Sequence, residues 1–285
     1  MRRRDFIRTT CAGIGAYTLG TRFGLADTTG KLASDIVTLG KSGIKASRLA
    51  MGTGTHGSDG SSDQTRLGLA SMSDLFKHAY DHGVNFWDSA DQYGSHPNLK
   101  DALKGIPREK VVILTKTHAS TADEMKADLD RFRQEIGTDY IDILLLHCMT
   151  DPNWPQQKAG AMDVLSEAAQ KGIVKMHGTS CHTFGALTTA ANTDWVQVDL
   201  ARINPAGVIM DAAPDKVVPV LRDMKKKGKA VIGMKIFGEG RLISRMDECL
   251  KFVMGLDCVD CFTIGSRSKD DLSDLVKRIP AAANS

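Results

Sequence analysis

Two groups that could share a proton lie five residues apart in the stretch NFWDSADQYG, residues 85–94. Asp88 ends a short apolar run that alternates like a strand, and Tyr93 follows in a polar loop that ends in glycine. A phenol has an ordinary pKa of roughly 10, so it gives up its proton slowly near neutral pH unless nearby positive charge stabilises the phenolate. Reduction of a carbonyl requires such a proton donor. The pair therefore predicts acid–base chemistry at the tip of a strand.

The missing positive charge and one more polar group end the next two apolar runs. VVILTK ends in Lys116, and IDILLLH ends in His147. If these runs are parallel strands of one barrel, their carboxyl ends meet on a single face. We expect Lys116 to lower the pKa of the Tyr93 hydroxyl, because an opposite charge within about 4–6 Å moves a pKa by roughly 1–3 units. Asp88 would keep the lysine charged and in place.

This pattern resembles the aldo-keto reductases, whose four catalytic residues are an aspartate, a tyrosine, a lysine and a histidine in this order. The resemblance covers residues 36–280 or so. It implies catalytic roles for Asp88, Tyr93, Lys116 and His147, with the histidine orienting the carbonyl. Taken singly, such residues are usually a cap, a packing residue and a solvated charge. The four together favour the catalytic interpretation.

Strand-like and helix-like segments alternate along the rest of the chain, which predicts an α/β fold, a (β/α)8 TIM barrel in a single domain. A hairpin-like opening and a first strand occupy residues 36–54. The further strands are expected at 84–88, 111–116, 140–146, 175–180, 195–200, 230–235 and 258–264, and the helices at 71–82, 97–105, 121–136, 159–171, 183–190, 215–227, 245–254 and 268–278. The glycine-rich GIGAYTLG, which could suggest a doubly wound sheet, lies in the N-terminal segment and cannot serve as its fingerprint.

The resemblance also implies a nicotinamide cofactor at the ends of the last four strands, with NADP (as NADPH) expected in preference to NAD. Ser180 and Gln197 match the family's ligands for the nicotinamide carboxamide, whereas Cys181 stands where the family commonly has asparagine. Met234 replaces an aromatic residue that stacks on the nicotinamide, and its polarizable side chain can still cover a ring face.

The phosphate groups of the cofactor would meet the segments after the last two strands. Backbone N–H groups in a glycine-rich loop and nearby cations are typical of such sites, although a plain surface loop is the alternative. Asp270 and Asp271 oppose the cations here. The expected phosphate ligands are Lys235, Gly238, Gly240, Arg267 and Lys269.

Residues 1–26 have the order of regions found in an export signal: basic residues, a mildly apolar span and small residues. Arg3 and Arg4 resemble the twin-arginine motif. We therefore expect the twin-arginine export machinery as a partner and the barrel, residues 27–285, in the periplasm. A disordered basic tail is the alternative. The apolar span is shorter than the ~20 residues of a membrane-spanning helix, so no stable membrane insertion is expected after cleavage.

The charge of the chain resides in this N-terminal segment. The formal net charge is +3, and loss of the five arginines and one aspartate of residues 1–26 leaves −1. The remainder has an ordinary globular composition, with 42% hydrophobic and 25% charged residues over the whole chain. Nothing in it indicates binding to nucleic acid.

The six cysteines, at 11, 148, 181, 249, 258 and 261, form no regular framework, so we expect no disulfides. Cys258 and Cys261 make one C-x-x-C, which we expect in a strand with its two side chains on opposite faces. No metal is expected, because the histidines and cysteines near the strand ends lack compact ligand spacing.

These observations predict an NADP-dependent oxidoreductase that reduces an aldehyde or ketone, with a small-molecule carbonyl compound as substrate. The alternative is a catalytically silent, nicotinamide-binding sensor or partner subunit on the same barrel. The replacements at Cys181 and Met234 motivate that alternative, and a barrel alone does not separate the two.

Overall fold

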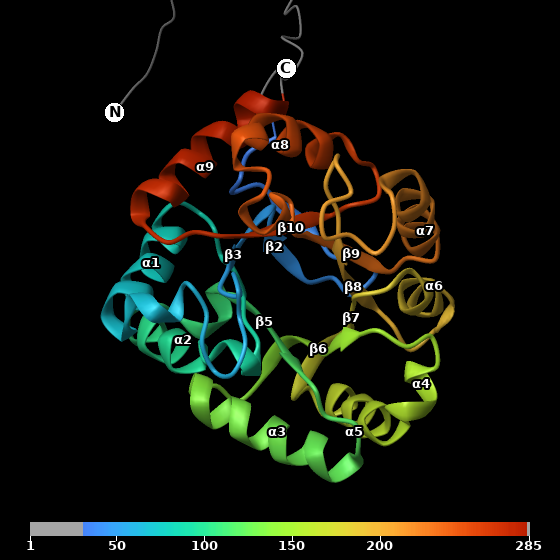
Figure 1. Ribbon diagram of the computed structural model, residues 1–285. Helices are drawn as coiled ribbons and strands as arrows, with labels where there is room; N and C mark the ends of the chain where they lie inside the picture. Colours follow the sequence, from blue (N-terminus) through green and yellow to red (C-terminus); the bar gives the residue numbers. More distant parts are fainter. Residues whose placement is uncertain (1–30, 284–285) are drawn as a thin grey trace, which may run out of the picture.

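The computed structural model describes residues 31–283, in which eight parallel strands close into a barrel inside a ring of helices (Figure 1). The predicted (β/α)8 fold is confirmed. Strand order around the barrel follows the chain, and the last strand pairs with the first. The strands are β3 (Leu49–Gly52), β4 (Phe86–Asp88), β5 (Val112–Thr117), β6 (Ile141–Met149), β7 (Val174–Cys181), β8 (Val198–Arg202), β9 (Ala230–Met234) and β10 (Cys261–Gly265).

The helices lie outside the barrel, mostly one after each strand (Figure 1). A short helix, α4, precedes α5 and was not predicted; the others lie within a few residues of their expected positions. They are α1 (Leu69–Asp81), α2 (His96–Ala102), α3 (Ala122–Ile136), α4 (Trp154–Gln157), α5 (Ala159–Gln170), α6 (Phe184–Asn192), α7 (Pro214–Lys226), α8 (Met246–Gly255) and α9 (Lys269–Ala283).

A hairpin closes the N-terminal end of the barrel. Its strands β1 (Ile36–Thr38) and β2 (Lys45–Ser47) are antiparallel, and Leu39 and Ala46 are buried in the barrel interior. Gly40 has φ +51°, and a Cβ there would lie 2.7 Å from the backbone nitrogen of the first β9 residue. Glycine therefore allows the turn to approach the barrel closely.

Side chains along each strand alternate between the barrel interior and the layer under the helices. On β4, β5 and β6 the interior residues include Phe86, Leu114 and Leu145. The next residue but one on the same face is Asp88 on β4, Lys116 on β5 and His147 on β6. The period of two thus carries the three polar residues to one end of the interior. The complete interior cluster comprises Leu39, Ala46, Ala50, Phe86, Val112, Leu114, Ile143, Leu145, Met176, Val198, Leu200, Ala230, Ile232, Met234 and Cys261.

Two strands begin three residues later than predicted. The strand expected at 195–200 is β8 at Val198–Arg202, and the strand expected at 258–264 is β10 at Cys261–Gly265. Cys258 consequently precedes β10, so the expectation that both cysteines of the C-x-x-C lie in a strand is wrong. Both are buried, and all five cysteines of the described region are free.

The predicted export signal, residues 1–26, lies outside the residues that the structure describes, and so does the first part of the expected barrel domain up to residue 30. Among residues 31–283, no helix is long and apolar enough to cross a bilayer.

Candidate active site

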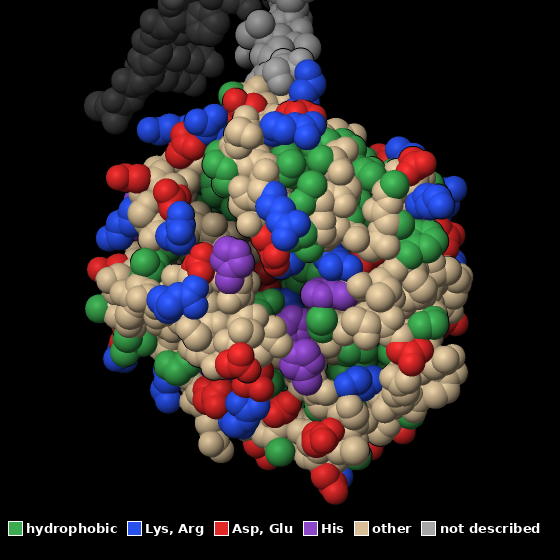
Figure 2. All heavy atoms as spheres, viewed as in Figure 1, with side chains coloured by type: hydrophobic (Ala, Val, Ile, Leu, Met, Phe, Trp, Pro, Cys, Tyr) green, Lys and Arg blue, Asp and Glu red, His purple; other side chains and the backbone are tan. Residues whose placement is uncertain are grey.

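The C-terminal ends of the barrel strands surround a hollow in the middle of one face, with histidine side chains at its rim (Figure 2). A cavity of about 390 Å³ opens there. Asp88, Tyr93 and Lys116 line it, together with residues from the ends of β3, β9 and β10. A volume of this size is typical of small-molecule sites, which span roughly 300–1,000 Å³.

Asp88 and Lys116, which both line this cavity, form a buried ion pair. The Lys116 Nζ donates to Asp88 Oδ1 at 2.5 Å and to the Ser89 carbonyl at 2.7 Å. Thr263 Oγ1 donates to the second carboxylate oxygen at 2.9 Å. Burial lowers the pKa of Lys116, and the Asp88 carboxylate opposes that shift. The aspartate therefore holds the lysine in place, as predicted from the sequence.

Tyr93 ends a short 3-10 helix, η2 (Asp91–Tyr93), and projects toward the same point. Its hydroxyl lies 3.4 Å from His147 Nε2, and the Lys116 Nζ lies 4.8 Å from the centre of its ring. Tyr93 and His147 meet edge to face, with ring centroids 5.6 Å apart. The four residues of the predicted tetrad are thus gathered at one place.

The protonation of Tyr93 differs from the expectation. Burial raises the pKa of the phenol, and the Asp88 carboxylate raises it further. The expectation that Lys116 lowers the pKa is not met, because the ammonium faces the ring and donates its hydrogen bonds to Asp88 and Ser89. Tyr93 is therefore a neutral phenol, the form that can donate a proton.

His147 is also neutral at physiological pH. Burial lowers its pKa well below the usual value, and the Lys116 charge lowers it further. Its Nδ1 is buried and has no hydrogen-bond partner within the described part of the chain. Its Nε2 is the nitrogen that faces Tyr93, so this atom is placed to hydrogen-bond a carbonyl oxygen beside the phenol.

Two glycines of the loop after β3 hold the ring of Tyr93. A Cβ on Gly54 would lie 2.3 Å from two carbon atoms of this ring, and a Cβ on Gly57 would lie 2.4 Å from another. Such distances are far below van der Waals contact, so only glycine allows this backbone to lie against the tyrosine. Sequence analysis did not identify these positions.

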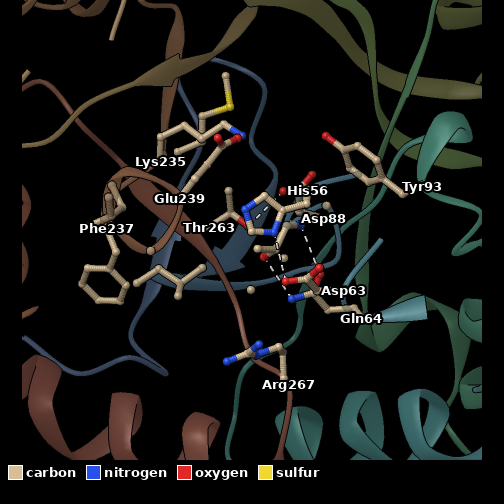
Figure 3. A pocket seen from close by; sticks show the side chains of 18 of the residues that line it. His56, Asp63, Gln64, Asp88, Tyr93, Lys235, Phe237, Glu239, Thr263 and Arg267 are labelled. Atoms are coloured by element: carbon tan, nitrogen blue, oxygen red, sulfur yellow. Dashed lines mark hydrogen bonds and ion pairs between the residues drawn. The ribbon is translucent and has the colours of Figure 1, made fainter. Parts of the chain in front are cut away.

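Four of the predicted cofactor ligands line the cavity: Met234, Lys235, Gly240 and Arg267. Figure 3 shows Lys235 beside Glu239 on one side of the cavity and Tyr93 on the other. Lys235 forms an ion pair with Glu239, a residue that the sequence analysis overlooked. A phosphate group bound by Lys235 would have to compete with this carboxylate.

The glycine-rich loop after β9 does not offer the backbone donors that we expected from it. The N–H of Gly238 donates to the Lys235 carbonyl at 2.9 Å, and the N–H of Gly240 donates to the Phe237 carbonyl at 3.0 Å. Gly238 is buried and does not line the cavity, whereas Gly240 does. The loop folds on itself as a 3-10 turn, which uses these groups internally.

Gln197 is not in this site, which corrects the prediction that it binds the carboxamide. It precedes β8 and lines a separate cavity with Lys41 and Lys229 at the opposite, N-terminal end of the barrel. Its Oε1 accepts a hydrogen bond from the His177 N–H. The physical reason is the alternation of β8, which turns Val198 and Leu200 inward and Gln197 away from the interior.

The remaining predicted ligands lie around the periphery of the site. Ser180 is buried near the C-terminal end of β7, where its hydroxyl oxygen accepts a hydrogen bond from the Cys148 N–H at 3.0 Å. Cys181 faces the opposite way, into the layer under the helices, so it does not stand in for a carboxamide ligand. Lys269 is the exposed first residue of α9 and is not among the residues lining the cavity.

A rim of polar residues that the sequence analysis did not assign lies beside His147. The ring of His118 stacks on that of His147, with centroids 4.8 Å apart. Cys148 Sγ lies 2.9 Å from His182 Nδ1. Cys148 has φ +64° at an irregularity in the pairing of β6 with β7, and such an irregularity redirects side chains at a strand end.

One group of side chains could in principle hold a metal ion among the described residues: Asp91, His96 and Glu135. These atoms already have partners, because Arg131 contacts both carboxylates and His96 hydrogen-bonds Glu135. The group is therefore an ion-pair network that already contains its own cation.

A model of the aldo/keto reductase family matches residues 48–255. The chain belongs to the aldo/keto reductase family, as the arrangement of Asp88, Tyr93, Lys116 and His147 indicated.

Curated relatives are similar in sequence to part of this chain. The aldo-keto reductase AFTS1 of Alternaria alternata is 30% identical over 169 residues, which cover 43% of this chain and 44% of the fungal protein. The versiconal hemiacetal acetate reductase of Aspergillus parasiticus is 30% identical over 175 residues, covering 50% and 49%. The chain thus spans about half the length of the curated relatives that it matches.

Solved structures show the same fold at low sequence identity. A protein of Pseudomonas aeruginosa described as an aldo-keto reductase superimposes with a TM-score of 0.73 at 19% identity, covering 90% of this chain and 98% of that one. The aldo-keto reductase AKR11C1 of Bacillus halodurans, in its holo form, gives a TM-score of 0.69 at 18% identity, covering 88% and 91%.

Proposed function

We propose that this protein is an NAD(P)H-dependent oxidoreductase that reduces the carbonyl of an aldehyde or ketone. One observation carries the proposal: a neutral phenol and a neutral imidazole lie 3.4 Å apart beside a buried Lys–Asp pair at the edge of the cavity. A carbonyl oxygen bound between Tyr93 and His147 would accept a hydrogen bond from each. Such donors stabilise the negative charge that develops on that oxygen.

In this mechanism the proton comes from a side chain of the protein. Tyr93 donates it to the carbonyl oxygen, and the Lys116 Nζ lies 4.8 Å from the centre of the tyrosine ring. Asp88 is held by both Lys116 and Thr263, so it fixes the position of the cation. His147 orients the substrate.

The residues of the cavity fit a nicotinamide dinucleotide, which when bound supplies the hydride. Met234 offers an apolar, polarizable surface for the ring. Gly240 lines the cavity, and nothing lies within 4 Å of its Cβ position, so the space beside it is open. Lys235 and Arg267 are the cations that would hold the phosphates. We propose NADP rather than NAD because Arg267 lines the cavity, and an arginine guanidinium can pair with the additional phosphate of NADP.

A catalytically silent, nicotinamide-binding protein is the second candidate. The Lys235–Glu239 ion pair favours it, because cofactor phosphates would have to displace Glu239. Wild-type protein that binds NADPH but reduces none of a broad panel of aldehydes and ketones would favour this alternative.

Replacement of Tyr93 tests the proposed chemistry. Tyr93→Phe removes the proton donor and keeps the ring, so carbonyl reduction should fall by at least 100-fold, since general acid catalysis contributes about 10²–10⁴-fold. NADPH binding, measured by quenching of protein fluorescence, should change little. Tyr80→Phe serves as a control on α1. Unchanged turnover of Tyr93→Phe would refute the assigned role.

We further propose that the protein is exported by the twin-arginine pathway and acts in the periplasm. The supporting observation is the sequence of residues 1–26. Since free NADPH is expected inside the cytoplasm, the protein would fold around its cofactor before export and release it slowly. A low dissociation rate corresponds to tight binding, which stabilises the folded state.

Changing the two arginines tests the route. The substitution of Arg3 and Arg4 by Lys should leave the protein in the cytoplasmic fraction, while the wild type appears in the periplasm carrying nicotinamide. Cell fractionation and absorbance of the purified protein provide the two measurements. Wild-type protein that remains in the cytoplasm would contradict the proposal.

A further inference from the structure

The turn that carries Tyr93 is tied to helix α3 by one arginine. Arg131 donates from Nη1 to Asp91 Oδ1 at 2.6 Å and from Nη2 to Asp91 Oδ2 at 2.9 Å. Asp91 is the first residue of η2, and Tyr93 is the last. A bidentate pair fixes both the distance and the orientation of the carboxylate, which a single contact does not.

The same guanidinium is itself held by the helix. Its Nη2 donates to Asp128 at 2.7 Å, and its Nη1 donates to Glu135 at 3.2 Å. The hydrogen bonds with Asp91 and Asp128 raise the pKa of Arg131. Burial acts to raise the pKa of Asp91, yet the hydrogen bonds from Arg131 and its charge outweigh burial and lower that pKa. The arginine therefore joins three carboxylates that would otherwise repel one another.

The network continues to the strand that carries the lysine. His96, which is 2% exposed, lies 2.7 Å from Glu135 Oε2 and 2.7 Å from Thr115 Oγ1. Thr115 directly precedes Lys116 on β5. Thr117, directly after that lysine, donates to Asp128. Both neighbours of Lys116 are thus connected to the carboxylates around Arg131.

The middle residue of η2 provides a second attachment. Gln92 Nε2 donates to the Gly57 carbonyl at 2.9 Å, and its Oε1 lies 2.5 Å from His118 Nε2. Gly57 is one of the glycines against the Tyr93 ring. Gln92 therefore ties η2 to the loop after β3, and Asp91 ties it to α3.

We propose that Arg131 is a positioning residue: through Asp91 it sets the place of the Tyr93 hydroxyl relative to Lys116 and His147. The proposal rests on the function proposed above. It adds a residue of α3 that does not itself line the cavity. A shift of the phenol by 1 Å is sufficient for a large loss, because misplacement of this size can lower a rate by about 100-fold.

The test compares Arg131→Met with Arg133→Met. Arg133 lies on the same helix and pairs with Asp130 in the same i, i+3 spacing, whereas its hydrogen bonds go to Asp130 and to the Leu129 carbonyl within α3. It therefore controls for loss of a helical arginine. For Arg131→Met we expect kcat to fall about 10- to 100-fold with little change in KM for the carbonyl substrate. Arg133→Met should retain kcat within twofold. Loss of activity through KM alone, or equal losses in both variants, would overturn the proposal.

Two further variants separate positioning from general destabilisation. Arg131→Lys keeps the charge but loses the bidentate geometry, so its kcat should be intermediate. In the double variant Arg131→Met/Asp91→Asn, one of the three carboxylates that repel one another is gone. Part of the kcat lost in Arg131→Met should therefore return. If Arg131→Met does not fold, Asp91→Asn alone breaks the same contact from the other side and should lower kcat in the same way. An unchanged kcat in Asp91→Asn would overturn the proposal.

A readout that needs no turnover keeps this inference distinct from the proposed function. Nitration by tetranitromethane, mapped by mass spectrometry, should be slow at Tyr93 in the wild type and several-fold faster in Arg131→Met. Tyr80 and Tyr140 serve as internal references. If the wild type reduces no carbonyl compound, the proposed function fails, yet this measurement still decides the inference. An unchanged nitration rate at Tyr93 would overturn it.

Discussion

At the scale of single residues, the main finding is the protonation of Tyr93. The phenol lies beside an ammonium, yet its pKa is raised, because burial and the Asp88 carboxylate both act in that direction. Lys116 is neutralised locally by Asp88 at 2.5 Å. A buried ion pair presents little net charge to a third group. Tyr93 is consequently suited to give a proton to a carbonyl and less suited to remove one from an alcohol.

This state predicts the pH dependence of the reaction. Since the raised pKa keeps the phenol protonated, kcat for carbonyl reduction should stay level between about pH 6 and 9 instead of falling near neutrality. The reverse oxidation needs the phenolate and should keep rising with pH over the same range. Steady-state rates in both directions give the profiles. A fall in the reduction rate with an apparent pKa near 7 would show that Lys116 lowers the phenol's pKa after all.

At the scale of elements, the ends of strands and the loops beyond them have separate tasks. The interior faces of β4, β5 and β6 place Asp88, Lys116 and His147. Tyr93 comes from a turn beyond β4, so its position depends on the loop after β3 as well as on α3. A residue on a loop needs such external contacts because its own backbone is not held by the barrel.

Gly54 provides a test at this scale. In Gly54→Ala the new methyl group would overlap the ring of Tyr93, whose nearest atoms lie 2.3 Å from the Cβ position. We expect kcat to drop about tenfold or more, with an overpacking cost of roughly 1–3 kcal/mol in the free energy of unfolding. Gly105→Ala is the matched control, since nothing lies within 4 Å of its Cβ position. Equal kcat in the two variants would argue against the fit between loop and ring.

At the scale of the whole molecule, polar groups are buried outside the cavity as well as around it. Asp199 on β8 is 0% exposed, and burial raises its pKa to about 7. One of its oxygens accepts from Thr179 Oγ1 at 2.8 Å, and the other has no hydrogen-bond partner in the described region. This carboxyl faces away from the interior, between strand and helix, and couples the stability of the fold to pH.

The sign of that coupling follows from the direction of the shift. The folded state holds the Asp199 proton more tightly than the unfolded state, so the free energy of unfolding should fall as pH rises from about 4 to 7 and then level off. Each pKa unit corresponds to about 1.4 kcal/mol, so the effect can reach a few kcal/mol. Urea unfolding should show that Asp199→Asn gains more stability relative to the wild type at pH 8 than at pH 5. An equal difference at both pH values would exclude Asp199 as the source.

The sequence alone determined the fold and which polar residues end the neighbouring strands. Strand periodicity is a local, covalent property, so the alternation in each apolar run already showed which residues share a face, and the order of runs showed that Asp88, Lys116 and His147 end neighbouring strands. The same reasoning failed for Gln197, because the prediction rested on the motif and disregarded that alternation. The alternation could also have identified Thr263, because this residue lies on the inner face of a predicted strand.

Only the tertiary structure decided how these residues behave. The contact of Thr263 with Asp88 joins positions 175 residues apart, and the clamp of Arg131 on Asp91 joins two elements that no local pattern connects. The pKa of Tyr93 depends on burial, and the pairing of Lys235 with Glu239 depends on the left-handed backbone of a folded loop. Burial and long-range contact are properties of the folded chain, because they depend on which distant segments fill the space around a side chain.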